Sequence, residues 1–157
     1  MKKLVKDSQV YSTELVLPND TNQLGNLLGG RLMHWIDISA AIAAQRHSGC
    51  VCVTASVDEL NFHHPIRLGE VVTLQASVNR AFRTSMEIGV LVLAAGLTGT
   101  MSRRANNAYL TFVAIDTKGR PVPVPPIVPE TEEEKRRYEE ALMRRQARLE
   151  RRQPAQS

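Results

Sequence analysis

The amino-acid sequence predicts an α+β fold in which an antiparallel sheet of about five strands wraps around one long helix, with a second helix near the C-terminus. One observation is that residues 31–49 carry apolar side chains nearly all round at helical spacing, which is typical of a helix covered on most sides. The other is that the pattern changes to period two after this helix, in four successive runs joined by short links. Short links favour antiparallel pairing, and the resulting sheet must cover the helix.

The size and composition agree with one domain of this kind. The chain has 157 residues, of which 43% are hydrophobic and 23% are charged, close to the average of globular proteins. A chain of this length buries about 68 to 70% of its unfolded surface. Aromatic residues make up only 4%, so we expect a core of Val, Leu, Ile and Ala and no stacking of aromatic rings on nucleic-acid bases.

The first predicted element is a strand, in the segment VYSTELVLP. Its side chains alternate between apolar and polar, and the alternation stops at Pro18. The following residues, 19–26, are dense in Asn, Asp, Thr and Gly, which indicates a loop.

The long helix follows Gly29 and Gly30 and reads RLMHWIDISAAIAAQRHSG. Gly49 stands where a helix commonly ends, because glycine adopts the left-handed backbone conformation of a C-terminal cap without strain. Four small side chains make the helix slim and predict that other elements wrap closely around it: Ala40, Ala41, Ala43 and Ala44.

The four alternating runs that follow are rich in β-branched residues, as strands are. They cover residues 51–60, 70–82, 84–95 and 107–116. The connection over residues 62–69 contains Pro and Gly and predicts a loop, whereas residues 97–104 predict the exposed end of a hairpin.

The C-terminal segment changes composition. Residues 121–129 read PVPVPPIVP, which predicts a polyproline-like spacer that cannot continue a sheet. Residues 130–152 predict a helix with a narrow apolar stripe of Tyr138, Leu142 and Leu149, supported by Glu to Arg pairs four residues apart. We therefore divide the chain into one domain, residues 1–121, and a spacer with an Arg-rich helix, residues 122–157.

Several catalytic and metal-binding signatures are absent from the sequence, among them G-x-S-x-G, the P-loop, the dinucleotide fingerprint, H-E-x-x-H and paired C-x-x-C. His63 and His64 are adjacent and point to opposite sides of an extended segment. His34 and His47 lie 13 residues apart on the helix, roughly 20 Å along its axis, so they cannot share a metal ion within one chain. We expect no metal site.

Other features favour a cytoplasmic location. Cys50 and Cys52 are too close for an ordinary disulfide, and we interpret them as small core residues of a protein in a reducing compartment. The N-terminus lacks the apolar stretch of a signal peptide. The longest uncharged run, residues 88–102, has 15 residues, fewer than the about 20 that a membrane span needs.

The net charge of +4 is not gathered in one half of the chain, which argues against a nucleic-acid binder. The last helix begins with acidic residues and ends with arginines. Two interpretations remain open for this order of charges: it complements the helix dipole, or the late arginines bind a phosphorylated ligand.

Asp37 is a carboxylate in an unusual position, between Ile36 and Ile38 in a helix otherwise short of charge. Either it faces a groove or bonds a partner, or it is functional. The free backbone N–H groups at Gly29 and Gly30 could polarise a carbonyl oxygen, but they lie roughly 10 to 12 Å along the axis from Asp37. Facing helices of two subunits would bring Asp37 of one subunit and the glycine N–H groups of the other to the same acyl group.

Three segments carry a family resemblance. TNQLGNLLGGRLMHWIDISAAIAAQRHSG, VTASVDELNF and NRAFRTSMEIGV, in this order, resemble the hotdog-fold acyl-CoA thioesterases of the cytosolic acyl-CoA hydrolase type. The similarity runs from about Leu15 to Phe112 and continues more weakly into the last helix. It implies the hotdog fold and hydrolysis of acyl-CoA to a free acid and CoA, with no metal or organic cofactor. The alternative on the same fold is a non-catalytic protein that binds acyl-CoA or an acyl carrier.

The resemblance also assigns catalytic residues. It places the catalytic acid at Asp37 and an Asn of the preceding loop at Asn22, acting across a subunit interface, with Gly30 as the candidate for a polarising N–H. Asp37 could activate water or attack the thioester itself. For Asn22 the alternative is a local role in forming the turn.

The same resemblance implies a CoA site and self-association. A single hotdog unit, in place of the tandem pair of other members, implies a dimer and a trimer of dimers. The CoA site would be formed by backbone of two strand segments, Ala55, Ser56 and Val57 and Thr84, Ser85 and Met86, and by basic residues of the last helix. Arg145 and Arg148 are the candidates in that helix, Arg144 is an equal alternative to either, and Arg83 is a further candidate.

Overall fold

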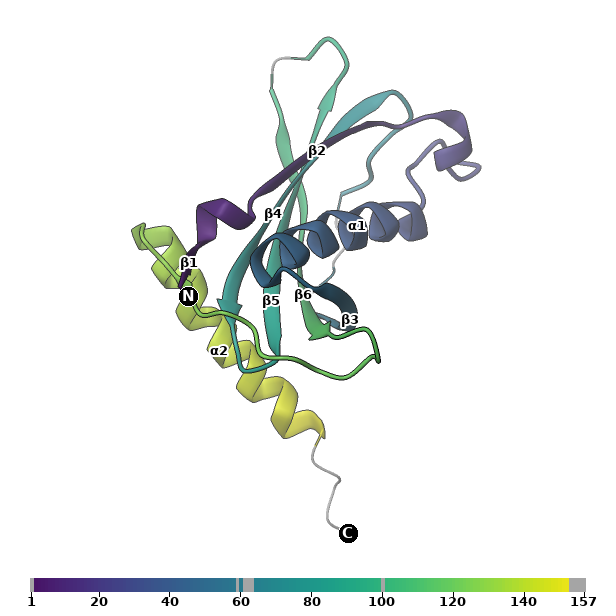
Figure 1. The fold of residues 1–157 in the computed structure, drawn as a ribbon. Helices are drawn as coiled ribbons and strands as arrows, with labels where there is room; N and C mark the ends of the chain where they lie inside the picture. Colours follow the sequence, from purple (N-terminus) through teal and green to yellow (C-terminus); the bar gives the residue numbers. More distant parts are fainter. Residues whose placement is uncertain (1, 59, 61–63, 100, 153–157) are drawn as a thin grey trace.

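A computed structural model describes residues 2–58, 60, 64–99 and 101–152 (Figure 1). Helix α1, Gly29–Ser48, crosses the concave face of a five-stranded antiparallel sheet, as the sequence predicts. The strand order is β2-β4-β5-β6-β3. The strands are β2 (Val10–Leu15), β3 (Val51–Asp58), β4 (Glu70–Ala81), β5 (Ser85–Gly96) and β6 (Arg103–Ile115).

One face of α1 forms the centre of the core. Leu32, Ile36, Ala40, Ala43 and Ala44 recur at helical spacing and are fully or almost fully buried against the sheet. The alanines allow the strands to approach the helix backbone closely, so larger side chains there would overpack the core at a cost of about 1–3 kcal/mol. The helix ends where Gly49 adopts a left-handed conformation, with φ of 71°.

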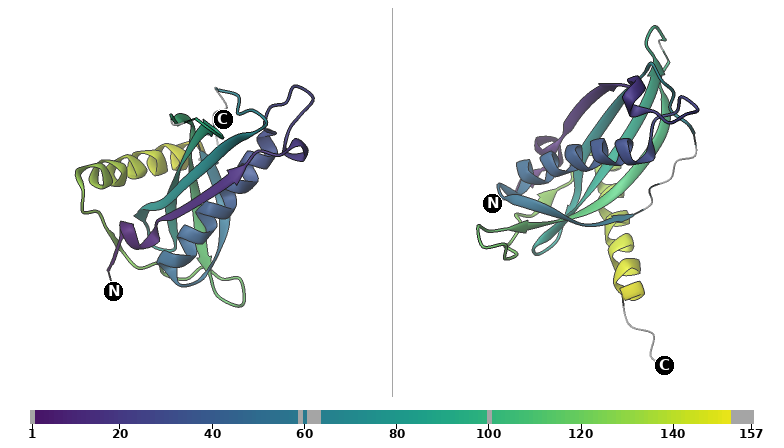
Figure 2. Two further views of the ribbon diagram at one scale, coloured as in Figure 1. Left: turned by 90° about the horizontal axis from the view of Figure 1, so that it is seen from above. Right: turned by 90° about the vertical axis from the view of Figure 1, so that its right-hand side faces the viewer.

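The opposite face of α1 is less covered than the sequence predicts. Ile38 and Ile42 are 45% and 38% exposed, so the sheet of one protomer wraps only part of the helix. Figure 2 shows the sheet curving around one side of α1, with β3 running along the helix as the last strand of the sheet. Apolar helix residues that one protomer leaves uncovered indicate that another surface covers them.

A β-bulge interrupts β3 at Ala55. Thr54 lies opposite Phe112 of β6, and Ser56 lies opposite the next residue, Thr111. Thr54 therefore faces α1, whereas Ser56 faces the outer side of the sheet. Further register shifts in the β4–β5 and β5–β6 pairs increase the local twist that bends the sheet around the helix.

The Pro-rich segment is more than a spacer. Ile127–Val128 form a short strand, β7, that pairs in parallel with β1, Lys3–Leu4, a pairing that the sequence does not predict. The ring of His47, at the end of α1, forms a 2.7 Å hydrogen bond with the Pro125 carbonyl oxygen. Two-residue strands are too short to show an alternating pattern, and their pairing depends on contacts that bring the two ends of the chain together.

Helix α2, Glu132–Arg152, packs on the outer face of the sheet, opposite α1 (Figure 2). It begins with a capping box, in which the Glu134 N–H donates to Thr131 Oγ1 and Glu134 Oε1 accepts from the Thr131 N–H. The predicted apolar stripe is wrong at Leu149, which is 44% exposed, while Arg148 is buried. The reason is that the sheet surface beneath α2 is polar and binds arginine side chains.

Candidate active site

Asp37 and Thr54 meet where α1 approaches the edge strand β3. The Thr54 hydroxyl donates a hydrogen bond to Asp37 Oδ1 across 2.7 Å. Asp37 is half-buried, and its Oδ2 has no hydrogen-bond partner within the described part of the chain. One carboxylate oxygen is therefore fixed in place, and the other is available to a water molecule or a ligand.

The sequence does not single out Thr54. A threonine in an alternating strand is an ordinary sheet residue, so its type and position carry no functional signal. Only the pairing of β3 with β6, and the bulge that follows Thr54, bring its hydroxyl to Asp37.

Asn22 lies in the exposed loop between β2 and α1. Its side-chain Oδ1 accepts the backbone N–H groups of Leu24 at 2.9 Å and Asn26 at 3.1 Å, and its own backbone N–H donates to the Asn26 carbonyl at 2.9 Å. Asn22 therefore helps to form the turn through its side-chain oxygen. The NH2 group of the same side-chain amide remains able to donate a hydrogen bond.

Asp20 connects this loop to the start of α1. Its carboxylate accepts the Leu17 N–H at 2.9 Å and forms a 3.2 Å ion pair with Arg31, while its carbonyl accepts the Leu28 N–H at 2.9 Å. Asp20 is buried. In the sequence Asp20 is one polar residue among several in the loop, and only the hydrogen bond to the Leu17 N–H, three residues earlier, distinguishes it from the others.

The N-terminus of α1 presents the backbone of Gly30. The residue before the helix, Leu28, provides no side-chain cap, so the first N–H groups of the helix lack an intrahelical partner. Gly30 is exposed, and a Cβ atom added to it would meet no atom within 4 Å.

Apolar side chains are exposed near Asp37 on α1 and on both faces of β3. Ile38 and Ile42 of α1 are 45% and 38% exposed, and Val57 of β3, opposite the buried Leu110, is 40% exposed. Val51 and Val53 are 63% and 46% exposed, but they alternate with Thr54 and therefore lie on the other face of the sheet. No other described strand pairs with the outer backbone edge of β3, which is the last strand of the sheet. Within the described residues the structure brings Asp37 to Thr54 but shows no contact between Asp37 and Asn22.

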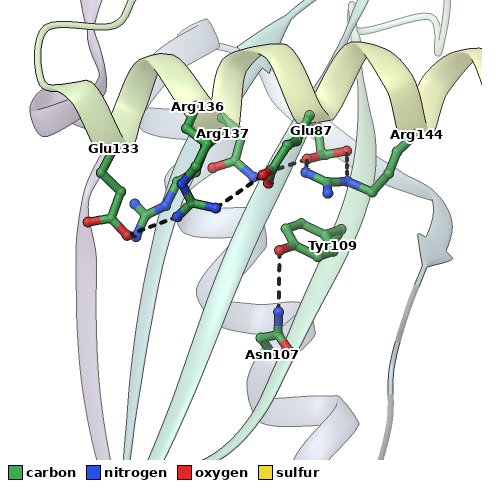
Figure 3. A network of polar contacts seen from close by, with 9 residues as sticks. Glu87, Asn107, Tyr109, Glu133, Arg136, Arg137 and Arg144 are labelled. Carbon is green, nitrogen blue, oxygen red and sulfur yellow. Dashed lines mark hydrogen bonds and ion pairs between the residues drawn. The ribbon is translucent and has the colours of Figure 1, made fainter.

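Arg144, one of the predicted CoA ligands, is held by a buried carboxylate on the sheet (Figure 3). Its guanidinium donates to both oxygens of Glu87 at 3.0 and 2.8 Å, and Glu87 is 1% exposed. Asn79 donates a further hydrogen bond to Glu87 at 3.0 Å, and the Tyr109 ring stacks against Arg144 at 3.6 Å.

The other arginines of α2 differ in their surroundings. Arg148 is buried and forms a 3.1 Å ion pair with Asp58 of β3. Arg145 stacks on the Phe82 ring at 4.5 Å, beside the exposed Arg83 in the β4–β5 turn. The structure therefore places Arg83 and Arg145 at one end of the sheet, and directs Arg144 and Arg148 toward carboxylates of the sheet.

The two predicted strand segments of the CoA site also differ. Ala55, at the bulge, and Val57 are exposed, whereas the Ser56 hydroxyl oxygen is buried and has no hydrogen-bond partner among the residues that the structure describes. In the second segment, Ser85 and Met86 are buried in the central strand β5. Met86 is paired with strands on both sides, so its backbone is not available to a ligand. Thr84 is half-buried in the turn.

Within the described ranges, no three His, Cys, Asp or Glu side chains gather as a metal ion would need. No helix there combines the length and apolar character required to cross a membrane.

Comparisons with known sequences agree on one family. Residues 24–99 match the thioesterase superfamily. The chain is 41% identical to the uncharacterized acyl-CoA thioester hydrolase YkhA of Bacillus subtilis, over 99% of this chain and 90% of that protein. It is 43% identical to acyl-coenzyme A thioesterase 11 of Mus musculus over 90% of this chain, but spans only 24% of that longer protein.

Solved structures share both the fold and the sequence. An apo-hexameric acyl-CoA thioesterase superposes with a TM-score of 0.93 at 40% identity, covering 98% of this chain and 99% of that one. An acyl-CoA hydrolase from Staphylococcus aureus has been solved in complex with butyryl coenzyme A, coenzyme A and coenzyme A disulfide. It superposes with a TM-score of 0.91 at 38% identity, covering 97% of this chain and 93% of that one.

Three variants of the Staphylococcus aureus hydrolase have also been solved. In these an asparagine, an aspartate 15 residues after it and a threonine 17 residues after the aspartate are each replaced by alanine. Together with the long central helix and the five-stranded sheet, these relatives identify the fold and the family. The chain belongs to the thioesterase superfamily, among the hotdog-fold acyl-CoA thioesterases.

Proposed function

We propose that this chain hydrolyses acyl-CoA to a free carboxylic acid and CoA, with Asp37 as the catalytic carboxylate and with no metal or organic cofactor. The observation that carries the proposal is the hydrogen bond from Thr54 to Asp37, which fixes one oxygen of a half-buried carboxylate and leaves the other free. Asn22, Asp37 and Thr54 also stand at the same intervals as the three residues varied in the Staphylococcus aureus hydrolase.

In the proposed reaction Asp37 acts as a general base. Its Oδ2 takes a proton from water while the water oxygen forms a bond to the thioester carbonyl carbon. The negative charge that develops on the carbonyl oxygen is stabilised by the N–H of Gly30 at the start of α1. The C–S bond then breaks, the acid is released, and the proton passes from Asp37 to the CoA sulfur.

The proposed site needs two protomers. Along the helix axis, Gly30 and Asp37 are about 10 Å apart at 1.5 Å per residue, too far to act on the same carbonyl group within one chain. The unpaired edge of β3 and the exposed Ile38, next to Asp37 in α1, suit a partner subunit on this side. We propose a dimer across β3 in which the partner supplies Asn22 and Gly30, and a trimer of such dimers like the hexameric relative.

For the CoA nucleotide we propose Arg83 and Arg145. Arg83 lies in the β4–β5 turn, Arg145 of α2 stacks on Phe82 of the same turn, and no buried carboxylate among the described residues holds either side chain. Arg144 and Arg148 would have to leave Glu87 and Asp58, uncovering a buried charge, before they could bind a phosphate. The exposed backbone near Ala55 and Val57 would bind the pantetheine amides.

We also propose a cytoplasmic location. Cys50 and Cys52 are both free thiols, and Cys52 is buried. Thiols that remain unpaired suit a reducing compartment.

The test is thiol release from acyl-CoA substrates of two to eighteen carbons by the wild-type protein and by Asp37→Asn. The variant should lose at least about a hundredfold in kcat, as expected for loss of a general base. Asp7→Asn, on an exposed residue of the N-terminal 3-10 helix, is the matched control and should keep full activity. CoA binding without thiol release by the wild-type protein would favour the non-catalytic alternative.

A single turnover in water enriched in oxygen-18 separates the two roles open to Asp37. With a general base, the heavy oxygen enters the product acid and none enters the protein. Heavy oxygen in the peptide that contains Asp37 would show attack by the carboxylate itself.

A further inference from the structure

The Pro-rich segment between β6 and α2, residues 121–128, runs past the ends of β4 and β5 toward the N-terminus, and we call it the strap (Figure 1). Its apolar side chains anchor it in the core, since Val124 is 7% exposed and Ile127 is 4% exposed. Its backbone forms hydrogen bonds with the end of β6, with the β4–β5 turn and with the end of α1. The strap therefore joins three separate parts of the fold.

The strap holds the β4–β5 turn at Arg83. The Val124 N–H donates to the Arg83 carbonyl oxygen across 2.9 Å. The carbonyl oxygen of the next residue, Thr84, instead accepts the N–H of Ala114 in β6 at 3.1 Å. The sheet thus fixes Thr84, and the strap fixes Arg83, whose exposed side chain we assign to the CoA nucleotide.

His47 holds the strap from the other side. It lies in the last turn of α1 and is 2% exposed. Its Nε2 donates to the carbonyl oxygen of Pro125, the residue next to Val124, across 2.7 Å. Two successive residues of the strap therefore connect a buried imidazole on α1 with the backbone of Arg83.

The connection between the two contacts is stiff. Val124 stands between Pro123 and Pro125. A proline ring fixes its own φ near −65°, and a residue before proline is restricted to extended conformations. A movement of Pro125 therefore also displaces the Val124 N–H, because the backbone between them has little freedom to absorb it.

We infer that His47 is a positioning residue for CoA binding, which holds Arg83 in place through the strap. The inference rests on the proposed thioesterase function and on Arg83 as a ligand of the nucleotide. Bonds from a guanidinium to a phosphate depend on the direction of its N–H groups. Loss of the His47 contact should therefore weaken the binding of the nucleotide and leave the chemistry at the thioester unchanged.

The experiment compares His47→Ala with His47→Gln at pH 8, where the ring is neutral because burial holds the pKa of His47 below its ordinary value of 6.5. Alanine removes the donor, whereas glutamine places an amide N–H close to the position of Nε2. His47→Ala should raise KM for acyl-CoA by about threefold to tenfold, a part of what a charge-assisted bond contributes, with kcat unchanged. His47→Gln should restore KM.

A short acyl-pantetheine thioester, which has no nucleotide, separates positioning from a general loss of structure. His47→Ala should hydrolyse it with wild-type kcat and KM. An unchanged KM for acyl-CoA in the folded variant, or equal impairment on both substrates, overturns the inference. Absence of thiol release by the wild-type protein from either substrate would instead contradict the proposed function.

A double variant shows whether His47 acts through Arg83. In the Arg83→Ala protein, His47→Ala should raise KM no further, because the guanidinium that it positions is gone. Additive increases in KM overturn the inference, and so does an Arg83→Ala protein with the KM of the wild type.

Arg46→Ala is the matched control. Arg46 lies in the same turn of α1 and donates a 2.8 Å hydrogen bond to the Gln9 carbonyl oxygen instead of to the strap. This variant should keep the wild-type KM for acyl-CoA, and an increase equal to that of His47→Ala overturns the inference. If His47→Ala does not fold, His47→Asn, whose shorter side chain does not reach Pro125, takes its place with the same expected results.

Discussion

The Thr54 hydroxyl and the Asp37 carboxylate, 2.7 Å apart, join the edge strand β3 to the central helix α1 at the site where we place the chemistry. The bulge at Ala55 turns Thr54 toward the helix and Ser56 toward the opposite face. The hydrogen bond restricts Asp37 to one orientation, and catalysis by a base depends strongly on such positioning.

Replacing Thr54 by valine removes this hydrogen bond but keeps the shape of the side chain. We expect kcat to fall by about tenfold to a hundredfold, with little change in KM, because the carboxylate loses its orientation. Thr54→Ser keeps the hydroxyl and should retain most of the activity. Equal kcat for the valine and wild-type proteins would mean that the hydrogen bond only supports the sheet.

Replacing the arginines of α2 and of the β4–β5 turn should have two different effects, one on substrate binding and one on stability. Arg83→Ala with Arg145→Ala should raise KM for acyl-CoA more than tenfold, since charge-assisted bonds to phosphate contribute about 1.5–3 kcal/mol each. The same double variant should hydrolyse a short acyl-pantetheine thioester normally, because that substrate has no nucleotide. Equal impairment on both substrates would place the phosphate site elsewhere.

Arg144→Ala should act on stability instead. It leaves the buried Glu87 carboxylate without its main charge partner, a change that costs about 3–5 kcal/mol in buried pairs. Chemical denaturation of this variant and of Arg144→Ala with Glu87→Gln measures the effect, and the double variant should regain part of the loss. An Arg144→Ala protein of wild-type stability but weak CoA binding would support Arg144 as a phosphate ligand after all.

His47 should make stability depend on pH. Burial is the main reason that the pKa of His47 lies below its ordinary value of 6.5, and the charge of Lys3 lowers it further, although the hydrogen bond with Pro125 opposes this shift. Its Nδ1 is buried and has no hydrogen-bond partner in the described part of the chain, as suits a neutral ring that donates through Nε2. Below pH 6.5 the unfolded chain takes up a proton that the folded protein resists, so the free energy of unfolding should fall as the pH drops below 6.5.

Urea denaturation between pH 5 and 8 tests this dependence. His47→Gln, which retains a donor for the Pro125 carbonyl, should show a flatter profile over the same range. A variant profile as steep as that of the wild-type protein would assign the pH dependence to other groups.

The sequence predicts the elements with long periodic patterns and leaves out those set by distant contacts. The period of α1, the cap at Gly49 and the alternation in β3 to β6 predict the helix and the antiparallel sheet, and the structure confirms them. The pairing of β1 with β7 involves two residues on each strand, too few for a pattern. The exposure of Leu149 reflects the polar surface beneath α2, which no local pattern in the helix reveals.

Some residues of the candidate site can likewise be recognised in the sequence, whereas others are identified only by the fold. Asp37 is visible in the sequence because a charge in an apolar helix is unusual. Thr54 and Asp20 have ordinary residue types for a strand and a loop, and only the fold gives them their partners. The CoA arginines could not be sorted by spacing alone, because the carboxylates of Glu87 and Asp58 that hold two of them lie far away in the sequence.

The central claim is that each active site combines Asp37 of one protomer with Asn22 of its partner, and a subunit-mixing experiment tests it most directly. Asn22→Ala and Asp37→Ala are each expected to be nearly inactive. After the two variants are mixed, unfolded and reassembled together, each mixed dimer contains one site with both changes and one intact site. Activity should return to about half of the wild-type value per mixed dimer, measured as thiol release from acyl-CoA after subunit exchange has been verified by mass spectrometry. If verified mixed dimers stay as inactive as the separate variants, each site lies within a single chain and the account is wrong.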